Sequence, residues 1–277
     1  MADQTFQIVI DGQTVKARPG ETVLVVCRRA GKDIPTLCHH QALEPYAACR
    51  VCLVEVSANG KEGLMPSCQY PASPGLVVQT DSPTVQRTRR LVLELLLARA
   101  PASDVVRALA ARYGVTQTPY PTDDPNEKCI VCGLCVRVCE EVLRIAAVGF
   151  SSRGVDRRVG APFDEASDVC IGCGACVAVC PTGHVASIDD GPLRRMSTWK
   201  TDLELATCEA CGRPFAPVRH LEHIRPTLPP HVPLERVCTA CRRAQTVARI
   251  SQTAAVAEAL ISGDPRIGIG AERIDRR

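Results

Sequence analysis

Alternating apolar and polar residues open the chain and predict a β-hairpin over residues 6–17. The segments FQIVI and QTVKA flank Asp11 and Gly12, a dipeptide that favours a two-residue hairpin turn. The apolar spacing then becomes helical, and a helix is expected over residues 21–30, where Gly31 ends it. The first elements therefore predict a mixed α and β fold.

Two short apolar runs, at residues 53–56 and 76–79, predict further strands. They follow a loop that is rich in cysteine. The order strand, turn, strand, helix, cysteine-bearing loop, strand, strand is that of a β-grasp ferredoxin. Residues 1–80 are therefore expected to form a β-grasp domain.

A long helix is predicted next, because Ser82 and Pro83 form a typical helix start and the pattern continues to about Ala100. One face of this helix is expected to carry four apolar residues: Leu91, Val92, Leu95 and Leu96.

A second helix is expected over residues 104–113, and the Pro-, Thr- and Asp-rich residues 115–127 indicate a linker. Residues 81–127 would thus be a helical hairpin with its linker. Near the other end, the Ala- and Val-rich residues 244–261 predict an amphipathic helix that packs on the rest of the chain. Residues 263–277 are expected to be a loose tail.

Sixteen of the 17 cysteines fall into four groups of four, each with the spacing of a metal or iron–sulfur site. The groups are Cys38, Cys49, Cys52 and Cys68; Cys129, Cys132, Cys135 and Cys139; Cys170, Cys173, Cys176 and Cys180; and Cys208, Cys211, Cys238 and Cys241. The remaining Cys27 lies among valines of the first helix and is expected to be a small buried apolar residue.

Composition and charge argue against several classes of protein, among them nucleic-acid-binding and membrane-spanning proteins. Aromatic residues make up only 3% of the chain, so bound metal should supply part of the stability. The net charge of +3 comes without a long basic block, which argues against nucleic-acid binding. We find no secretory signal and no apolar run long enough to span a bilayer. A soluble cytoplasmic protein is expected, in which thiols stay reduced and ligate metals instead of forming disulfides.

The most specific signal is the pattern CxxCxxCxxxC, which occurs twice at a spacing of 41 residues. Three closely spaced thiolates fit one cubane, and the fourth cysteine of each run reaches the other cubane. On this rule the first [4Fe–4S] cluster is held by Cys129, Cys132, Cys135 and Cys180, and the second by Cys170, Cys173, Cys176 and Cys139. Two zinc sites would not need this repeated spacing. Residues 128–190 are expected to form a bacterial-ferredoxin-like domain.

The first group, Cys38, Cys49, Cys52 and Cys68, follows a looser version of the plant-type [2Fe–2S] pattern. Its place on β-grasp elements favours that cluster over a structural zinc ion. The last group, Cys208, Cys211, Cys238 and Cys241, has the spacing of a zinc ribbon, although four thiolates would also suit a further [4Fe–4S] cluster. Residues 191–262 are therefore expected to form a zinc-ribbon-like domain, with residues 191–205 as a connector.

His220, His223 and His231 lie between the two cysteine pairs of the last group and are expected to remain outside its ligand set. The sequence contains no catalytic constellation, no GxGxxG motif and no P-loop. The chain is therefore expected to carry electrons, while substrate chemistry belongs to partner subunits. The fold class is α+β.

Residues 34–68, IPTLCHHQALEPYAACRVCLVEV…LMPSC, resemble the diaphorase iron–sulfur subunit of bidirectional NAD-reducing [NiFe] hydrogenases. They also resemble the N-terminal part of the large iron–sulfur subunit of respiratory complex I. The runs KCIVCGLCVRVCEE and CIGCGACVAVCPTG are similar to the paired cubane domain of this family, and the resemblance covers residues 5–188.

One departure from that family stands out. Its members usually carry a [4Fe–4S] site of one histidine and three cysteines between the two ferredoxin-like parts, and residues 69–128 contain neither His nor Cys. We expect that cluster to be absent. Electrons must then cross directly between the [2Fe–2S] cluster and the cubanes, or through a cluster of a partner.

The resemblance implies an electron-transfer subunit between a flavin/NAD(P)-binding diaphorase-type subunit and a hydrogenase-type catalytic subunit. The C-terminal segment resembles zinc-ribbon tails on ferredoxin-like subunits of membrane-bound hydrogenases. Two alternatives stay open within the redox class: a subunit of an NAD-linked formate dehydrogenase, or of another low-potential, electron-bifurcating reductase. A zinc-stabilised scaffold would instead contain zinc throughout and show no redox titration.

Overall fold

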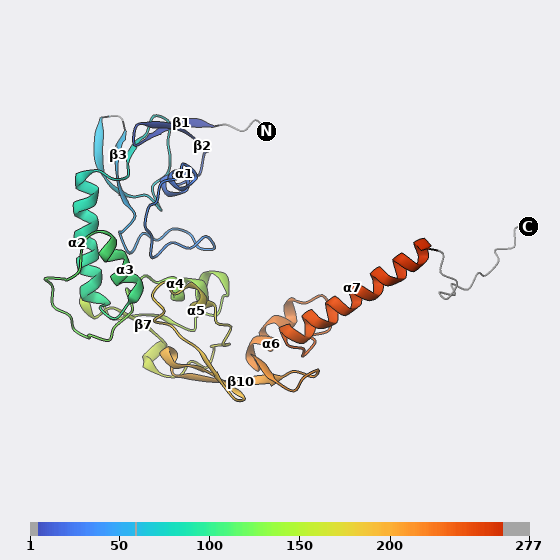
Figure 1. The fold of residues 1–277 in the computed structure, drawn as a ribbon. Coiled ribbons are helices and arrows are strands. Elements are labelled where there is room, and N and C mark those ends of the chain that lie inside the picture. The colour runs from blue at the N-terminus through green and yellow to red at the C-terminus, as the bar shows by residue number, and fades with distance from the viewer. Residues whose placement is uncertain (1–4, 59, 263–277) are drawn as a thin grey trace, which may run out of the picture. The chain divides into compact units, whose positions relative to one another are not determined.

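The computed structural model describes residues 5–58 and 60–262 and has an α+β fold (Figure 1). The chain divides into two compact units, residues 1–189 with 194–202 and residues 190–193 with 203–277. The expected tail over residues 263–277 lies outside the described part. None of the described helices combines the length and apolar character that a membrane-spanning segment requires.

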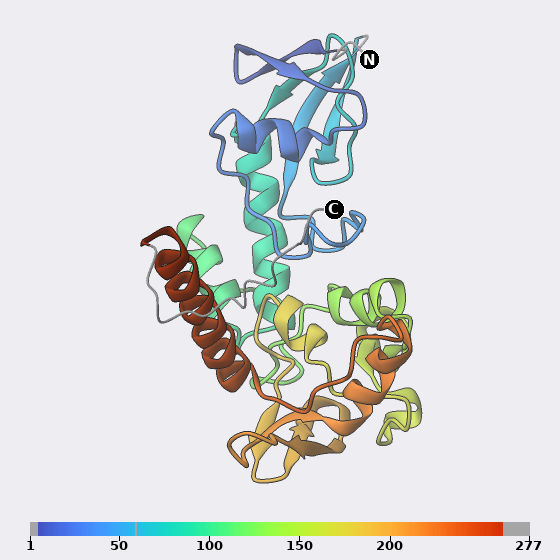
Figure 2. The same ribbon diagram turned by 90° about the vertical axis from the view of Figure 1, so that its right-hand side faces the viewer.

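The N-terminal part forms the expected β-grasp, a five-stranded sheet in the order β2-β1-β5-β3-β4. Its strands are β1 (Phe6–Ile10), β2 (Gln13–Ala17), β3 (Leu53–Ala58), β4 (Lys61–Pro66) and β5 (Val77–Gln79). Helix α1 (Val23–Arg29) lies across one face of this sheet and buries Val23, Leu24, Val26 and Cys27 against it (Figure 2). Strand β4 was not predicted, because KEGLMP does not alternate apolar and polar residues.

The predicted helical hairpin is present as α2 (Pro83–Arg99) and α3 (Asp104–Arg112). The hydroxyls of Ser82 and Ser103 cap the two helices by accepting hydrogen bonds from backbone N–H groups. Of the four residues predicted for one face of α2, Val92 and Leu96 pack against the core, whereas Leu91 and Leu95 are 46% and 48% exposed. The buried positions of the helix are Val85, Arg89, Leu93 and Leu97. Leucine and valine occupy almost every position near the end of this helix, so the spacing of apolar residues alone does not show which face is buried.

Arg89 is a buried cation on that inner face, only 2% exposed. Its Nη2 donates to the carbonyl oxygen of Leu53 at 2.8 Å, and Nη1 lies 3.4 Å from the hydroxyl of Tyr113. Through this side chain α2 is connected to the start of β3 and to the end of α3.

We therefore expect Arg89→Ala to destabilise the protein by about 3 kcal/mol, because it leaves a buried carbonyl unpaired and opens a cavity. The midpoint of anaerobic urea unfolding, followed by circular dichroism, should fall. Arg87→Ala, an exposed change on the same helix, is the control and should shift the midpoint little. Equal midpoints for both variants would contradict the role of Arg89.

The two CxxCxxCxxxC runs are carried by loops and short helices. The helices are α4 (Leu134–Arg137), a π-helical turn (Val138–Val142) and α5 (Ala175–Val179), and their apolar residues join those of α2 and α3 in one core. The hairpin of β6 (Gly149–Ser151) and β7 (Arg158–Gly160) lies between the two runs in the sequence.

The last part of the chain contains a four-stranded sheet in the order β11-β10-β9-β8. Its strands are β8 (Ile188–Asp190), β9 (Leu193–Met196), β10 (Thr201–Thr207) and β11 (Pro214–Pro217). The prediction of a simple connector over residues 191–205 was therefore wrong, because this segment contains β9, a 3-10 turn (Ser197–Trp199) and most of β10.

Helix α6 (Val218–Ile224) follows the sheet, and α7 (Thr239–Ser262) begins earlier than expected. The predicted packing of α7 is not seen for residues 242–254, whose side chains are all exposed. Arg, Gln, Ser and Thr alternate with the apolar residues of α7, so the helix has only a narrow apolar face.

Candidate iron–sulfur and metal centres

The first cysteine group meets in the loops at one end of the β-grasp sheet. All four residues, Cys38, Cys49, Cys52 and Cys68, are buried. The backbone N–H of Cys49 donates to the Sγ of Cys38 at 3.3 Å. Ala47 and Arg50 adopt left-handed backbone with φ of 57° and 60°, which wraps the loop around Cys49.

The thiols of this group interact in two pairs. A hydrogen bond from the Cys38 thiol is the main cause that lowers the pKa of Cys49, to about 6, and the N–H of Val51 adds to it. In the same way the Cys68 thiol lowers the pKa of Cys52 to about 7. One member of each pair is thus ready to become a thiolate, the form that binds iron.

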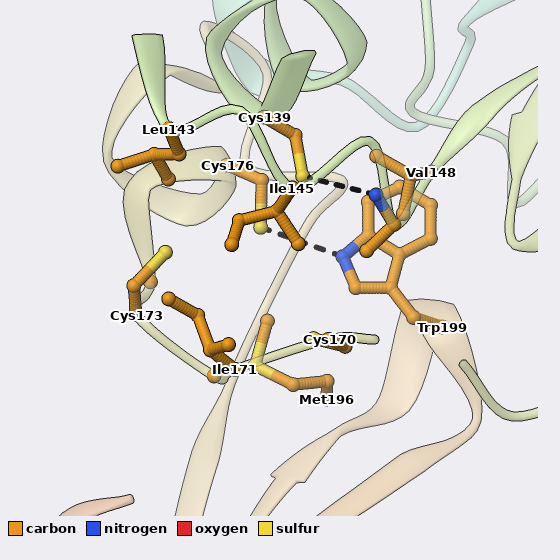
Figure 3. Close-up of a pocket in the computed structure, with 13 residues that line it drawn as sticks. Cys139, Leu143, Ile145, Val148, Cys170, Ile171, Cys173, Cys176, Met196 and Trp199 are labelled. Atoms are coloured by element: carbon orange, nitrogen blue, oxygen red, sulfur yellow. Dashed lines mark hydrogen bonds between the residues drawn. The ribbon is translucent and has the colours of Figure 1, made fainter. Parts of the chain in front are cut away.

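The second cubane site is a cavity that brings together Cys139, Cys170, Cys173 and Cys176 (Figure 3). The rest of its lining is apolar and includes Leu143, Ile145, Val148, Ile171, Met196 and Trp199. The backbone N–H of Ala147 donates to Cys139 Sγ at 3.3 Å, and the indole Nε1 of Trp199 donates to Cys176 Sγ at 3.4 Å. Four convergent thiols, an apolar wall and N–H donors suit an iron–sulfur cluster.

The other cubane site combines Cys129, Cys132 and Cys135 with Cys180 of the second run. The charge of Cys180 acts on the thiols of Cys129 and Cys132, which places it on the side of the first run. Burial is the largest effect on the pKa of Cys180 and raises it. Hydrogen bonds from the N–H groups of Val185 and Thr182 outweigh burial, and the net pKa is lowered. The exchange of fourth cysteines between the runs stays a prediction, which the place of Cys139 in the cavity of the second run supports.

Glycine is required at one turn of the first run. Gly133 has a φ of 77°, and a Cβ atom there would lie 2.7 Å from the ring of Phe150. The turn places Leu134 so that its N–H donates to Cys132.

The three cluster-type sites follow one another within one compact unit. Cys38, Cys49 and Cys132 belong to the same buried core, and the charge of Cys49 acts on the thiol of Cys132. The charge of Cys176 acts in turn on Cys135. The order is therefore the first group, then the site of Cys132 and Cys135, then the site of Cys176.

The last group is much tighter. The Sγ atoms of Cys208, Cys211, Cys238 and Cys241 all lie within 4.8 Å of one another, and those of Cys211 and Cys238 are 3.8 Å apart. A tetrahedral zinc ion with Zn–S bonds of about 2.3 Å holds its sulfurs about 3.8 Å apart. A cubane spreads them further because four iron atoms stand between them. In the described part of the chain, the other cysteine groups do not gather so closely.

The ribbon-like geometry has a local cause. Cys208 and Cys211 occupy the turn between β10 and β11, where Cys208 N–H donates to the carbonyl of Arg213 at 2.9 Å. Cys238 and Cys241 lie at the start of α7. The three histidines between the pairs are outside the metal-binding group, as expected.

Trp199 is the site residue that motif reasoning missed. It lies in the supposed connector, away from any cysteine run, and is 1% exposed. Its being the only tryptophan of the chain was the one sequence feature that could have drawn attention to it. Nothing in the neighbouring sequence indicates a contact with Cys176.

Comparison with known proteins agrees with these sites. A family model for a 2Fe-2S iron-sulfur cluster binding domain matches residues 3–83. Models for 4Fe-4S dicluster domains match residues 128–184 and 163–214.

Individual relatives give the same result. The chain is 33% identical over 179 residues to a subunit of the NADH-quinone oxidoreductase of Rhizobium meliloti (strain 1021), covering 56% of this chain and 21% of the relative. It is 37% identical over 175 residues to the HndD subunit of the NADP-reducing hydrogenase of Solidesulfovibrio fructosivorans, covering 53% and 30%. The chain thus spans less than a third of these curated relatives.

The match to one solved structure extends over a larger part of the related chain. A chain of the NAD+-reducing [NiFe]-hydrogenase in the H2-reduced state is 32% identical with a TM-score of 0.50, over 57% of this chain and 75% of that one. Together with the domain matches, this likeness confirms the resemblance seen in the sequence. The chain belongs to the family of iron–sulfur electron-transfer subunits that NADH-quinone oxidoreductases and NAD-reducing hydrogenases share.

Proposed function

We propose that this chain relays electrons between a flavin/NAD(P)-binding subunit and a hydrogenase-type catalytic subunit of a cytoplasmic multisubunit oxidoreductase. The observation that carries the proposal is the continuity of the three cluster-type sites. Cys49 of the first site and Cys132 of the next share one buried core, although the histidine-containing site of the family has no ligands here. Electrons therefore have a direct route through this chain.

The proposal includes three ligand sets, which the grouping of the cysteines supports. The [2Fe–2S] cluster is assigned to Cys38, Cys49, Cys52 and Cys68. The first [4Fe–4S] cluster is assigned to Cys129, Cys132, Cys135 and Cys180, and the second to Cys139, Cys170, Cys173 and Cys176. When bound, these clusters supply one-electron carriers. The chain's residues hold the thiolates, shield them from water and direct N–H groups at them.

The tight C-terminal group is assigned to one structural zinc ion. The 3.8 Å separation of Cys211 and Cys238 supports zinc over a further cubane. We therefore expect about ten iron atoms and one zinc ion per chain.

The test is to purify the tagged chain with its natural partners without oxygen, add NADH, NADPH, H2 or formate, and follow the clusters by EPR. We expect a nicotinamide to reduce all three clusters. In Cys49→Ala, reduction of the cubanes by the nicotinamide should fall at least 100-fold, because the entry site is lost. Dithionite should still reduce the cubanes in that variant, which shows that the remaining fold is intact.

Other outcomes would contradict the proposal. Unchanged nicotinamide-driven reduction in Cys49→Ala would exclude the [2Fe–2S] cluster as the entry. Reduction by formate but not by H2 would assign the catalytic partner to the formate class. Zinc without iron would exclude electron transfer.

A further inference from the structure

The single tryptophan of the chain contacts a proposed cluster ligand from outside the cysteine runs. Trp199 Nε1 donates a hydrogen bond to Cys176 Sγ at 3.4 Å, and the side chain is 1% exposed (Figure 3). The indole lines the cavity that holds the proposed ligands of the second [4Fe–4S] cluster. A buried N–H group therefore faces a sulfur that would carry part of the cluster's charge.

The backbone around Trp199 is fixed by further hydrogen bonds. The buried hydroxyl of Thr201 donates to the carbonyl of Trp199 at 2.8 Å and accepts from the N–H of Ser167 at 3.0 Å. Lys200 adopts a left-handed backbone with φ of 51°, and its Nζ contacts the carboxylate of Asp164 at 2.6 Å. The indole is thus held in place instead of merely filling a gap.

A hydrogen bond to a ligand sulfur has a definite effect on an iron–sulfur centre. The reduced cluster carries one more negative charge than the oxidised one, so an N–H donor stabilises the reduced form more. The reduction potential therefore rises. In the buried, apolar surroundings of Cys176 this effect is weakly screened.

The two cysteine runs differ in the hydrogen bonds that side chains donate to their sulfurs. Cys135 corresponds to Cys176 in the 41-residue repeat. Within residues 5–58 and 60–262, no side chain donates a hydrogen bond to Cys135, whose pKa is raised by burial and by the charges of neighbouring thiols. Two similar motifs thus differ through a residue that neither motif contains.

We infer that Trp199 raises the reduction potential of the second [4Fe–4S] cluster through its hydrogen bond to Cys176, and so draws electrons to the end of the route away from the [2Fe–2S] cluster. This inference rests on the ligand sets proposed above. With both clusters bound, one electron would pass from the first to the second, and the indole of Trp199 would keep its proton because no bond breaks.

The experiment is a redox titration of the full-length chain, purified without oxygen and followed by EPR. Trp199→Phe should lower the ratio of reduced to oxidised second cluster about tenfold at a fixed potential, a shift of about 59 mV for one electron. The other two clusters should keep their potentials. The second cubane is identified as the EPR signal that disappears in Cys139→Ala.

An isostere separates the hydrogen bond from packing. Because the chain has one tryptophan, growth of a tryptophan auxotroph on β-(3-benzothienyl)alanine replaces only this side chain and removes its N–H while keeping its shape. It should lower the potential as Trp199→Phe does. Tyr120→Leu, which changes an aromatic residue outside the cavity, should not.

Two results would show whether the inference about Trp199 or the proposed function is wrong. If the isostere leaves the potential unchanged while all three clusters are bound, the inference is wrong and the ligand assignment stands. If the wild-type chain binds no [4Fe–4S] cluster, the proposed function fails first, and the iron and sulfide content shows this before any titration. Nitrogen-15 ENDOR of indole-labelled protein should also show one coupling, to the second cubane only.

Discussion

Replacing Cys139 with alanine is expected to remove the cluster of the other cysteine run and leave the cluster of its own run in place. Cys139 lines the cavity formed by Cys170, Cys173 and Cys176, whereas the charge of Cys180 acts on the thiols of Cys129 and Cys132. The iron content should therefore fall from about ten atoms to about six per chain, and one of two [4Fe–4S] EPR signals should vanish. Alanine is preferred to serine because a serine oxygen can still bind iron.

Cys180→Ala should remove the opposite cubane, so the two variants should lose different EPR signals. Cys27→Ala is the matched control: this buried thiol belongs to no group, and burial raises its pKa to about 11. Its iron content should not change. If Cys139→Ala instead eliminated the signal assigned to Cys129, Cys132 and Cys135, each run would hold its own cluster and the crossed arrangement would be wrong.

The sequence predicted most of the β-grasp and the ferredoxin runs because their signals are local. The Asp11-Gly12 turn forms with φ of 48° and 80°, and Ser82 caps α2 as expected. Cluster spacing is equally local, since three thiolates within seven residues must surround one centre. Local rules of this kind do not depend on what packs against the element.

The features that escaped prediction depend on tertiary packing. The inner face of α2 includes Arg89, a charged residue whose burial is explained by the carbonyl of Leu53 far away in the chain. Trp199 reaches Cys176 only because residues 194–202, which include the 3-10 turn Ser197–Trp199, belong to the same compact unit as the second cysteine run. The proposal of zinc over a cubane at the last group likewise rests on the sulfur separations, which spacing along the chain does not give.

Removal of the ion at the C-terminal group should unfold the segment that carries it while sparing the three clusters. Few large apolar residues support residues 208–241, of which only Cys208, Pro217 and Cys238 are buried. Zinc binding is worth about 10–16 kcal/mol in small four-ligand domains at pH 7, so the proposed zinc ion would supply most of the local stability. Cys238→Ala should lose the zinc ion and speed hydrogen exchange across residues 203–241, with iron content unchanged.

The same site should release its metal as the pH falls, because protons compete for the thiolates. The backbone N–H and guanidinium of Arg213 are the first causes that lower the pKa of Cys211, to about 6. A depressed pKa keeps this ligand ionised down to lower pH, so its contribution is full above the usual thiol pKa of 9.0 and is lost as the pH falls from there through about 6. Arg213→Ala should therefore move zinc release, followed with a chromogenic chelator, to higher pH. Arg225→Ala, an exposed change in the same unit, is the control, and an identical release profile for both variants would contradict the role of Arg213.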